Sequence, residues 1–177
     1  ESNNGWRRDT AARLLYERQD RQAIRLLRKL SQTSKSPVAR AQALHSLRGL
    51  EDLEPQDVLH GLQDNDANVR IQALRLAERF AKDSPAIRAA IYKAASDPDQ
   101  LVRYQATFSV GACRESQRDV VLAEILRRDG SDAWFRLAAQ TSLGEGAAGV
   151  IGELLNDQEF RNSSHGQKFL TQLAEQV

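Results

Sequence analysis

The amino-acid sequence predicts an all-α fold, an α-solenoid of about five helix pairs followed by a C-terminal helix. Three observations support this prediction: a repeat of about 32 residues, an N-cap residue at a fixed place in each copy, and two helical segments per copy. A single helix pair of this length cannot bury both of its apolar faces, so neighbouring pairs must stack on one another.

The repeat is marked by an arginine that is followed three residues later by an alanine. These arginines are Arg8, Arg40, Arg70, Arg103 and Arg136, separated by 32, 30, 33 and 33 residues. A glutamine stands between the arginine and the alanine in three of the five copies, at Gln42, Gln72 and Gln105. A fixed period of this length is typical of proteins built from stacked helix pairs.

A residue that favours a helix N-cap stands four positions before each of these arginines. These residues are Asn4, Ser36, Asp66, Asp99 and Asp132. Their side-chain oxygens can accept hydrogen bonds from the unpaired amides of a first helical turn. We therefore expect the first helix of every unit to begin directly after its cap residue.

Each unit is expected to contain a first amphipathic helix, a short turn and a second, more apolar helix. The predicted units span about residues 4–35, 36–65, 66–98, 99–131 and 132–157. The second helices are expected over residues 20–31, 55–63, 85–96, 117–128 and 147–156. Phe169, Leu170 and Leu173 predict a terminal helix over residues 165–176, and residues 1–177 are interpreted as a single repeat domain.

Composition excludes several classes of protein. The single cysteine, Cys113, excludes an internal disulfide and a cysteine-based zinc cage. No apolar run approaches the roughly 20 residues of a membrane-spanning helix, so no membrane insertion by this segment is expected. Methionine is absent, also from position 1, and we interpret the chain as a segment of a larger protein.

The segments Asp66–Ala73 and Asp99–Ala106 carry a turn aspartate followed by an arginine and an alanine at fixed spacing. With this signature, residues 4 to 156 resemble HEAT repeats, and in particular their phycobilisome-lyase-like subgroup. The resemblance implies an α-α superhelix of the armadillo-like kind that binds other proteins.

The N-terminal segment from Asn4 to Leu15 is similar to the start of HEAT arrays in large planctomycete proteins. Those proteins resemble membrane-bound sugar dehydrogenases, with a β-propeller before the array and a cytochrome c module after it. The resemblance implies that this chain separates two such domains in an exported or periplasmic redox protein.

Residues that could carry chemistry have structural interpretations here. His45, His60 and His165 lack metal-ligand spacing, and Cys113 is expected to be a buried structural thiol. The glycine-rich stretch 144–149 is interpreted as an inter-helix turn, and Trp134 with Phe135 as a core contact between units. We therefore predict no catalytic residues, no cofactor and no metal site.

The repeated arginines are likewise interpreted as structural. Asp66 and Arg70, Asp99 and Arg103, and Asp132 and Arg136 are pairs with i, i+4 spacing. Each aspartate can cap its helix, while the arginine bonds either that aspartate or the turn of a neighbouring unit. Such contacts would set how the units stack.

Charge is distributed unevenly along the chain. Residues 1–48 contain 11 Lys and Arg and 4 Asp and Glu, a balance of +7, whereas residues 49–177 contain 14 and 20, a balance of −6, which together give the net +1. Arg21, Arg25, Arg28 and Lys29 follow helical spacing and form a basic stripe opposite apolar residues. This stripe is the candidate partner-binding site, the alternative being a solvated helix face.

The sequence thus favours a non-catalytic scaffold or protein-interaction module that acts as a spacer or docking domain in a larger protein. Its partners would be other proteins or neighbouring domains of the same polypeptide. The alternatives are a nucleic-acid-binding repeat protein and an enzyme of the lyase-like or glycosylase-like HEAT branches. The acidic residues between Glu51 and Asp66 argue against a long track for a phosphate backbone.

Overall fold

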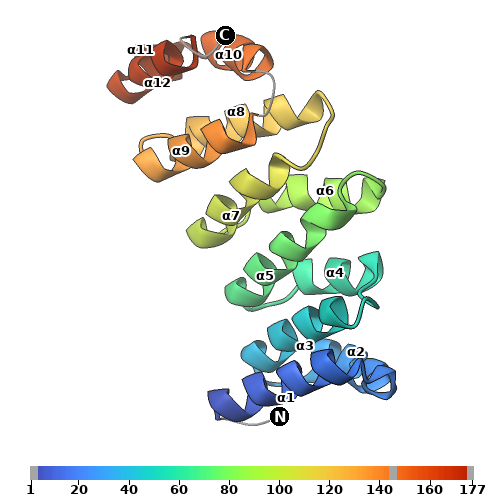
Figure 1. Cartoon of the computed structure of the whole chain (residues 1–177). Coiled ribbons are helices and arrows are strands. Elements are labelled where there is room, and N and C mark those ends of the chain that lie inside the picture. Colours follow the sequence, from blue (N-terminus) through green and yellow to red (C-terminus); the bar gives the residue numbers. More distant parts are fainter. Residues whose placement is uncertain (1–3, 144–146, 175–177) are drawn as a thin grey trace. The chain divides into compact units, whose positions relative to one another are not determined.

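The computed structural model of the chain describes residues 4–143 and 147–174 and is helical throughout, with no strand in these two ranges. The helices form two compact units, Glu1–Phe80 and Ala81–Val177. The division at residue 80 falls inside the third predicted repeat, between its first and second helices. Figure 1 shows helix pairs within each unit.

The first compact unit contains five α-helices among its described residues. They are α1 (Gly5–Arg18), α2 (Ile24–Thr33), α3 (Pro37–Gly49), α4 (Pro55–Leu62) and α5 (Ala67–Ala77), with short 3₁₀ turns at Arg21–Ala23 and Glu78–Phe80. The first helices of successive repeats pack side by side, α1 on α3 and α3 on α5. The second helices α2 and α4 form another layer behind them.

The second compact unit continues the same arrangement. Its helices are α6 (Pro85–Ala94), α7 (Gln100–Val110), α8 (Gln117–Asp129), α9 (Ala133–Ser142), α10 (Ala148–Leu155), α11 (Gln158–Asn162) and α12 (Ser164–Ala174). The first helices α7 and α9 pack on each other, as do the second helices α8 and α10. The order of helices confirms the solenoid fold class that the repeat predicts.

The predicted N-caps are confirmed in all five repeats. The side chain of Asp66 accepts hydrogen bonds from the amides of Asn68 and Val69, at 2.9 and 3.3 Å. Asn4, Ser36, Asp99 and Asp132 cap their helices in the same way. Local chemistry of the first turn therefore fixes where each first helix begins.

Apolar side chains between the two layers form the core of each unit. In the first unit the fully buried residues include Leu44, Leu47, Val58, Val69 and Leu74. In the second unit they include Ile87, Val102, Leu122, Phe135 and Phe169. A Cβ atom at Gly61 would lie 2.9 Å from a methyl of Leu44 and 3.0 Å from Cβ of Ala73. This glycine therefore permits the close approach of α4 to α3 and α5.

The C-terminal region differs from the single helix predicted over residues 165–176. The structure has a short helix α11 before α12, because the side chain of Asp157 caps α11 through the Phe160 amide at 2.8 Å. Phe160 is buried, and the chain turns at Ser163, whose hydroxyl accepts from the Gly166 amide at 3.0 Å. Within the described residues, no helix has both the length and the apolar character needed to cross a membrane.

Candidate functional site

The repeated arginines bond to the turns between successive repeats. Nη1 of Arg40 donates to the carbonyl oxygen of Ser34 at 2.7 Å, six residues earlier. Arg70, Arg103 and Arg136 make the same contact, to Asp64, Asp97 and Gly130, at 2.8, 3.0 and 2.7 Å. The last carbonyls of a helix lack partners within it, and the arginine supplies donors for the turn that follows.

Two of these arginines also form bidentate ion pairs with an aspartate near the end of the same repeat. Nε and Nη2 of Arg40 donate to the carboxylate of Asp64, both at 2.6 Å, and those of Arg103 donate to Asp129 at 2.8 and 2.7 Å. The Arg103–Asp129 side chains are each 9% exposed. The arginine was predicted to bond either its own cap aspartate or the turn of a neighbouring repeat. Arg103 makes the second kind of contact, and Asp99 caps α7.

The Arg40–Asp64 pair predicts how stability depends on pH. Burial raises the pKa of Asp64, but the hydrogen bonds from Arg40 and the Asp66 amide outweigh it and hold that pKa below its ordinary value. Folding therefore favours the ionised form of Asp64. The contribution of this carboxylate to stability is present above the unfolded-state pKa of about 4 and is lost as the pH falls through the lower folded-state pKa.

We expect Asp64→Asn to lower the free energy of unfolding at pH 7 and to flatten its decrease on acidification below about pH 4. Urea denaturation at several pH values measures both effects. The exposed Asp83 offers a matched control, since Asp83→Asn should change neither quantity. An acid dependence that is unchanged in Asp64→Asn would contradict this assignment.

The predicted basic stripe divides into one structural residue and three exposed ones. Nε of Arg28 donates to the buried Asp57 at 2.9 Å, and its Nη2 donates to the carbonyl and carboxylate oxygens of Asp52 at 2.8 and 3.0 Å. Arg28 thus ties α2 to α4 and to the turn before it, and it neutralises part of the acidic segment that follows the basic one in sequence.

The remaining members of the stripe, Arg21, Arg25 and Lys29, are exposed on the 3₁₀ turn and on α2. Arg28 therefore has a structural role that these three residues do not share. Whether Arg21, Arg25 and Lys29 bind a partner stays a prediction.

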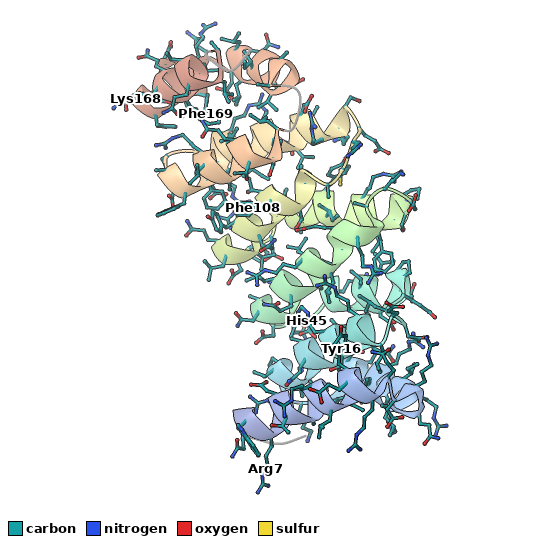
Figure 2. All side chains as sticks on the ribbon, viewed as in Figure 1. Arg7, Tyr16, His45, Phe108, Lys168 and Phe169 are labelled. Carbon is teal, nitrogen blue, oxygen red and sulfur yellow. The ribbon has the colours of Figure 1, made fainter. Side chains whose placement is uncertain are left out.

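Another candidate surface lies on the second unit, where the first helices α7 and α9 pack together. We call it the α7/α9 face and define it by Leu101, Tyr104, Phe108, Trp134 and Leu137. Leu101, Trp134 and Leu137 are 63%, 65% and 49% exposed. Phe108, labelled in Figure 2, and Tyr104 are half-buried.

Aromatic contacts hold this face in place. The ring of Tyr104 makes edge-to-face contacts with Phe108 and with the buried Phe135, at centroid distances of 5.2 and 5.3 Å. The aromatic rings beneath the exposed side chains therefore pack together and link the two helices. Aromatic residues supported in this manner are typical of binding hot spots.

Trp134 was expected in the core beside Phe135, and this expectation is wrong. Only Phe135 is buried, while Trp134 is exposed, because successive residues of a helix point about 100° apart and only one of them can face α7 and α8. The repeat contains the missed signal. Leu101 and Trp134 each stand two residues before a repeat arginine, and so do the exposed Trp6 and Val38.

The corresponding face of the first unit carries polar and charged side chains beside apolar ones. A groove of about 600 Å³ runs over α1, α3 and α5, and its lining includes Asp9, Val38, Gln42, His45 and Gln72. Nε2 of Gln42 donates to Asp9 at 3.1 Å, and Nε2 of His45, which is labelled in Figure 2, lies 3.0 Å from Oε1 of Gln72. Gln42 and Gln72, two of the three glutamines that mark the repeat, therefore link neighbouring first helices.

That groove has a partial set of the groups that a glycosylase-like site would need. Its lining includes Arg8 and the carboxylates of Asp9 and Asp66, but it contains no phenylalanine, tyrosine or tryptophan. The carboxylate of Asp66 is already used to cap α5.

Cys113 and His165, which the sequence also singles out, occupy structural positions. Cys113 is buried, and burial raises the pKa of its thiol, which agrees with the structural role predicted for it. His165 packs edge-to-face on Phe160. Of the glycine-rich stretch, residues 144–146 lie outside the described residues. The described residues contain no cluster of three or more histidine, cysteine or acidic side chains that could hold a metal ion.

The paired helices and the regular contacts between their turns define a helical repeat protein of the solenoid class. A family model described as HEAT repeats matches residues 55–144, which is half of the chain. The chain therefore belongs to the HEAT-repeat family. A comparison with curated proteins finds no significant match. HEAT repeats commonly serve as protein-interaction scaffolds and are typically non-catalytic.

Proposed function

We propose that the chain is a non-catalytic protein-interaction module and that the α7/α9 face binds its partner protein. The observation that carries this proposal is the exposure of Leu101, Trp134 and Leu137 on adjacent helices. Core packing does not account for large apolar side chains in these positions. Contiguous apolar patches on a folded surface are typical of interaction sites.

The partner expected for this face is a protein with an apolar surface. The exposed side chains of the face carry no charge, and the repeat arginine beside Trp134, Arg136, donates to the carbonyls of Gly130 and Ser131. A phosphate backbone would find little to pair with here, whereas aromatic anchors favour a protein interface.

The exposed part of the basic stripe is a second candidate surface. Arg21, Arg25 and Lys29 suit an acidic partner, such as a neighbouring domain of the same polypeptide. A role as a spacer or docking domain inside a larger protein, for instance a redox protein of the dehydrogenase type, rests on the N-terminal resemblance described above.

The test is affinity capture from a lysate of the source organism, with each captured protein then titrated in purified form. We expect a captured partner to bind the wild-type chain and to lose about a hundredfold in affinity for Leu101→Glu/Trp134→Glu, since hot-spot residues contribute 2 kcal/mol or more. Trp6→Glu, at the same repeat position in the first unit, is the matched control.

Full affinity of that partner for the double variant would rule out the α7/α9 face. Loss of affinity in Arg21→Gln/Arg25→Gln alone would instead assign binding to the basic stripe. Retardation of generic duplex DNA at low salt would favour the nucleic-acid alternative.

A further inference from the structure

An apolar cavity of about 290 Å³, open to solvent on one side, lies between α1, α2 and α3 in the first unit. It exists because α1 presents the small side chains of Ala11 and Ala12 toward the other two helices, and none of the described side chains of α1 is fully buried. Leu27 and Leu30 of α2 and Ala43 of α3 form the opposite walls.

The cavity leaves apolar side chains of three helices accessible to water. A ligand with an apolar body would cover this surface and remove it from water, which favours binding. Preformed apolar pockets are the usual binding sites of small molecules.

The rim of the cavity is positively charged. Arg7 and Arg8 belong to its lining, and none of the lining residues is acidic. Arg7 is exposed, and its side chain extends away from the ribbon of α1 in Figure 2. The neighbouring carboxylate, Asp9, accepts a hydrogen bond from Gln42. Guanidinium groups bind carboxylates with strong, charge-assisted hydrogen bonds.

Together these observations define the chemistry of the ligand. We propose that the cavity binds a medium-chain alkyl carboxylate, with the chain between the three helices and the carboxylate at Arg7 and Arg8. A cavity of about 150 Å³ holds benzene, so 290 Å³ admits roughly twelve non-hydrogen atoms, the size of decanoate. This site is independent of the α7/α9 face.

The test uses the 177-residue chain and isothermal titration with decanoate below its micellar concentration. Decan-1-ol and decyltrimethylammonium, which share the alkyl chain, serve as comparison ligands. We expect decanoate to bind at one site and to bind at least tenfold more tightly than decyltrimethylammonium, because only the carboxylate pairs with the arginines. Trp6, one residue from Arg7, provides a fluorescence signal for the same titration.

Two variants locate the site. Ala12→Phe fills the cavity and should abolish binding, while Ala89→Phe on the exposed side of α6 should not. Arg7→Gln removes a rim charge without touching the core and should weaken decanoate about three- to tenfold, with no effect on decan-1-ol. Arg13→Gln, also exposed on α1, is its control.

The proposal is overturned if millimolar decanoate gives no heat and no fluorescence change, or if decyltrimethylammonium binds as tightly as decanoate. It is also overturned if Arg7→Gln binds decanoate with wild-type affinity, a result that does not depend on how well Ala12→Phe folds. Cosedimentation with anionic phospholipid vesicles in the absence of decanoate binding would show that the arginines serve a membrane surface instead.

Discussion

Replacing Asp129 by alanine is expected to lower the free energy of unfolding by about 3–5 kcal/mol, because it leaves the guanidinium of Arg103 buried without its carboxylate. Arg103 is 7% exposed, and both of its bonds to Asp129 are shorter than 3 Å. Removing one partner of a buried pair costs far more than the pair itself contributes, since the remaining charge has already lost its water.

Chemical denaturation followed by circular dichroism measures this effect. Glu124 lies on the same helix and is exposed, so Glu124→Ala should stay within about 0.5 kcal/mol of the wild type. A loss below 1 kcal/mol for Asp129→Ala would mean that water replaces the carboxylate at Arg103.

Phe135→Ala is expected to lower stability strongly and Trp134→Ala hardly at all, although the two residues are adjacent. Phe135 is 1% exposed and supports Tyr104, so its truncation should cost about 3–5 kcal/mol through lost burial and the cavity left behind. Trp134→Ala should change stability by less than about 0.5 kcal/mol, because its side chain is in solvent.

These two variants distinguish an effect on stability from an effect on binding. If the α7/α9 face is an interaction site, Trp134→Ala weakens the partner while the melting temperature is kept. Thermal unfolding and titration of the purified partner measure the two properties. A strongly destabilised Trp134→Ala would show that this tryptophan packs against the protein and would remove it from the proposed interface.

Much of the fold could be predicted from the sequence because its signals are local. The caps at Asp66 and Asp99 act within one helical turn, so a side chain and its spacing suffice to place the start of a helix. The second helix of the fourth repeat was expected over residues 117–128 and is observed at Gln117–Asp129. The additional helix α11 was missed because it is only five residues long.

The candidate sites were harder to predict because they depend on contacts between helices. Helical spacing places Arg28 on a basic stripe but does not reveal that Asp57, 29 residues later, lies within hydrogen-bond distance. For Trp134 and Phe135, only a comparison of equivalent repeat positions indicates which of the two faces the core. The cavity behind α1 has no sequence signature, since alanines such as Ala12 are equally typical of tight packing.

The spacing of the polar contacts has a consequence for how the protein folds. The polar side-chain pairs, from Arg40–Asp64 within one repeat to Gln42–Asp9 between two repeats, link residues only 24 to 33 positions apart. Closing loops of this length costs little chain entropy, and low contact order is associated with rapid folding. Folding can therefore nucleate at any helix pair and spread to its neighbours, as in a one-dimensional array.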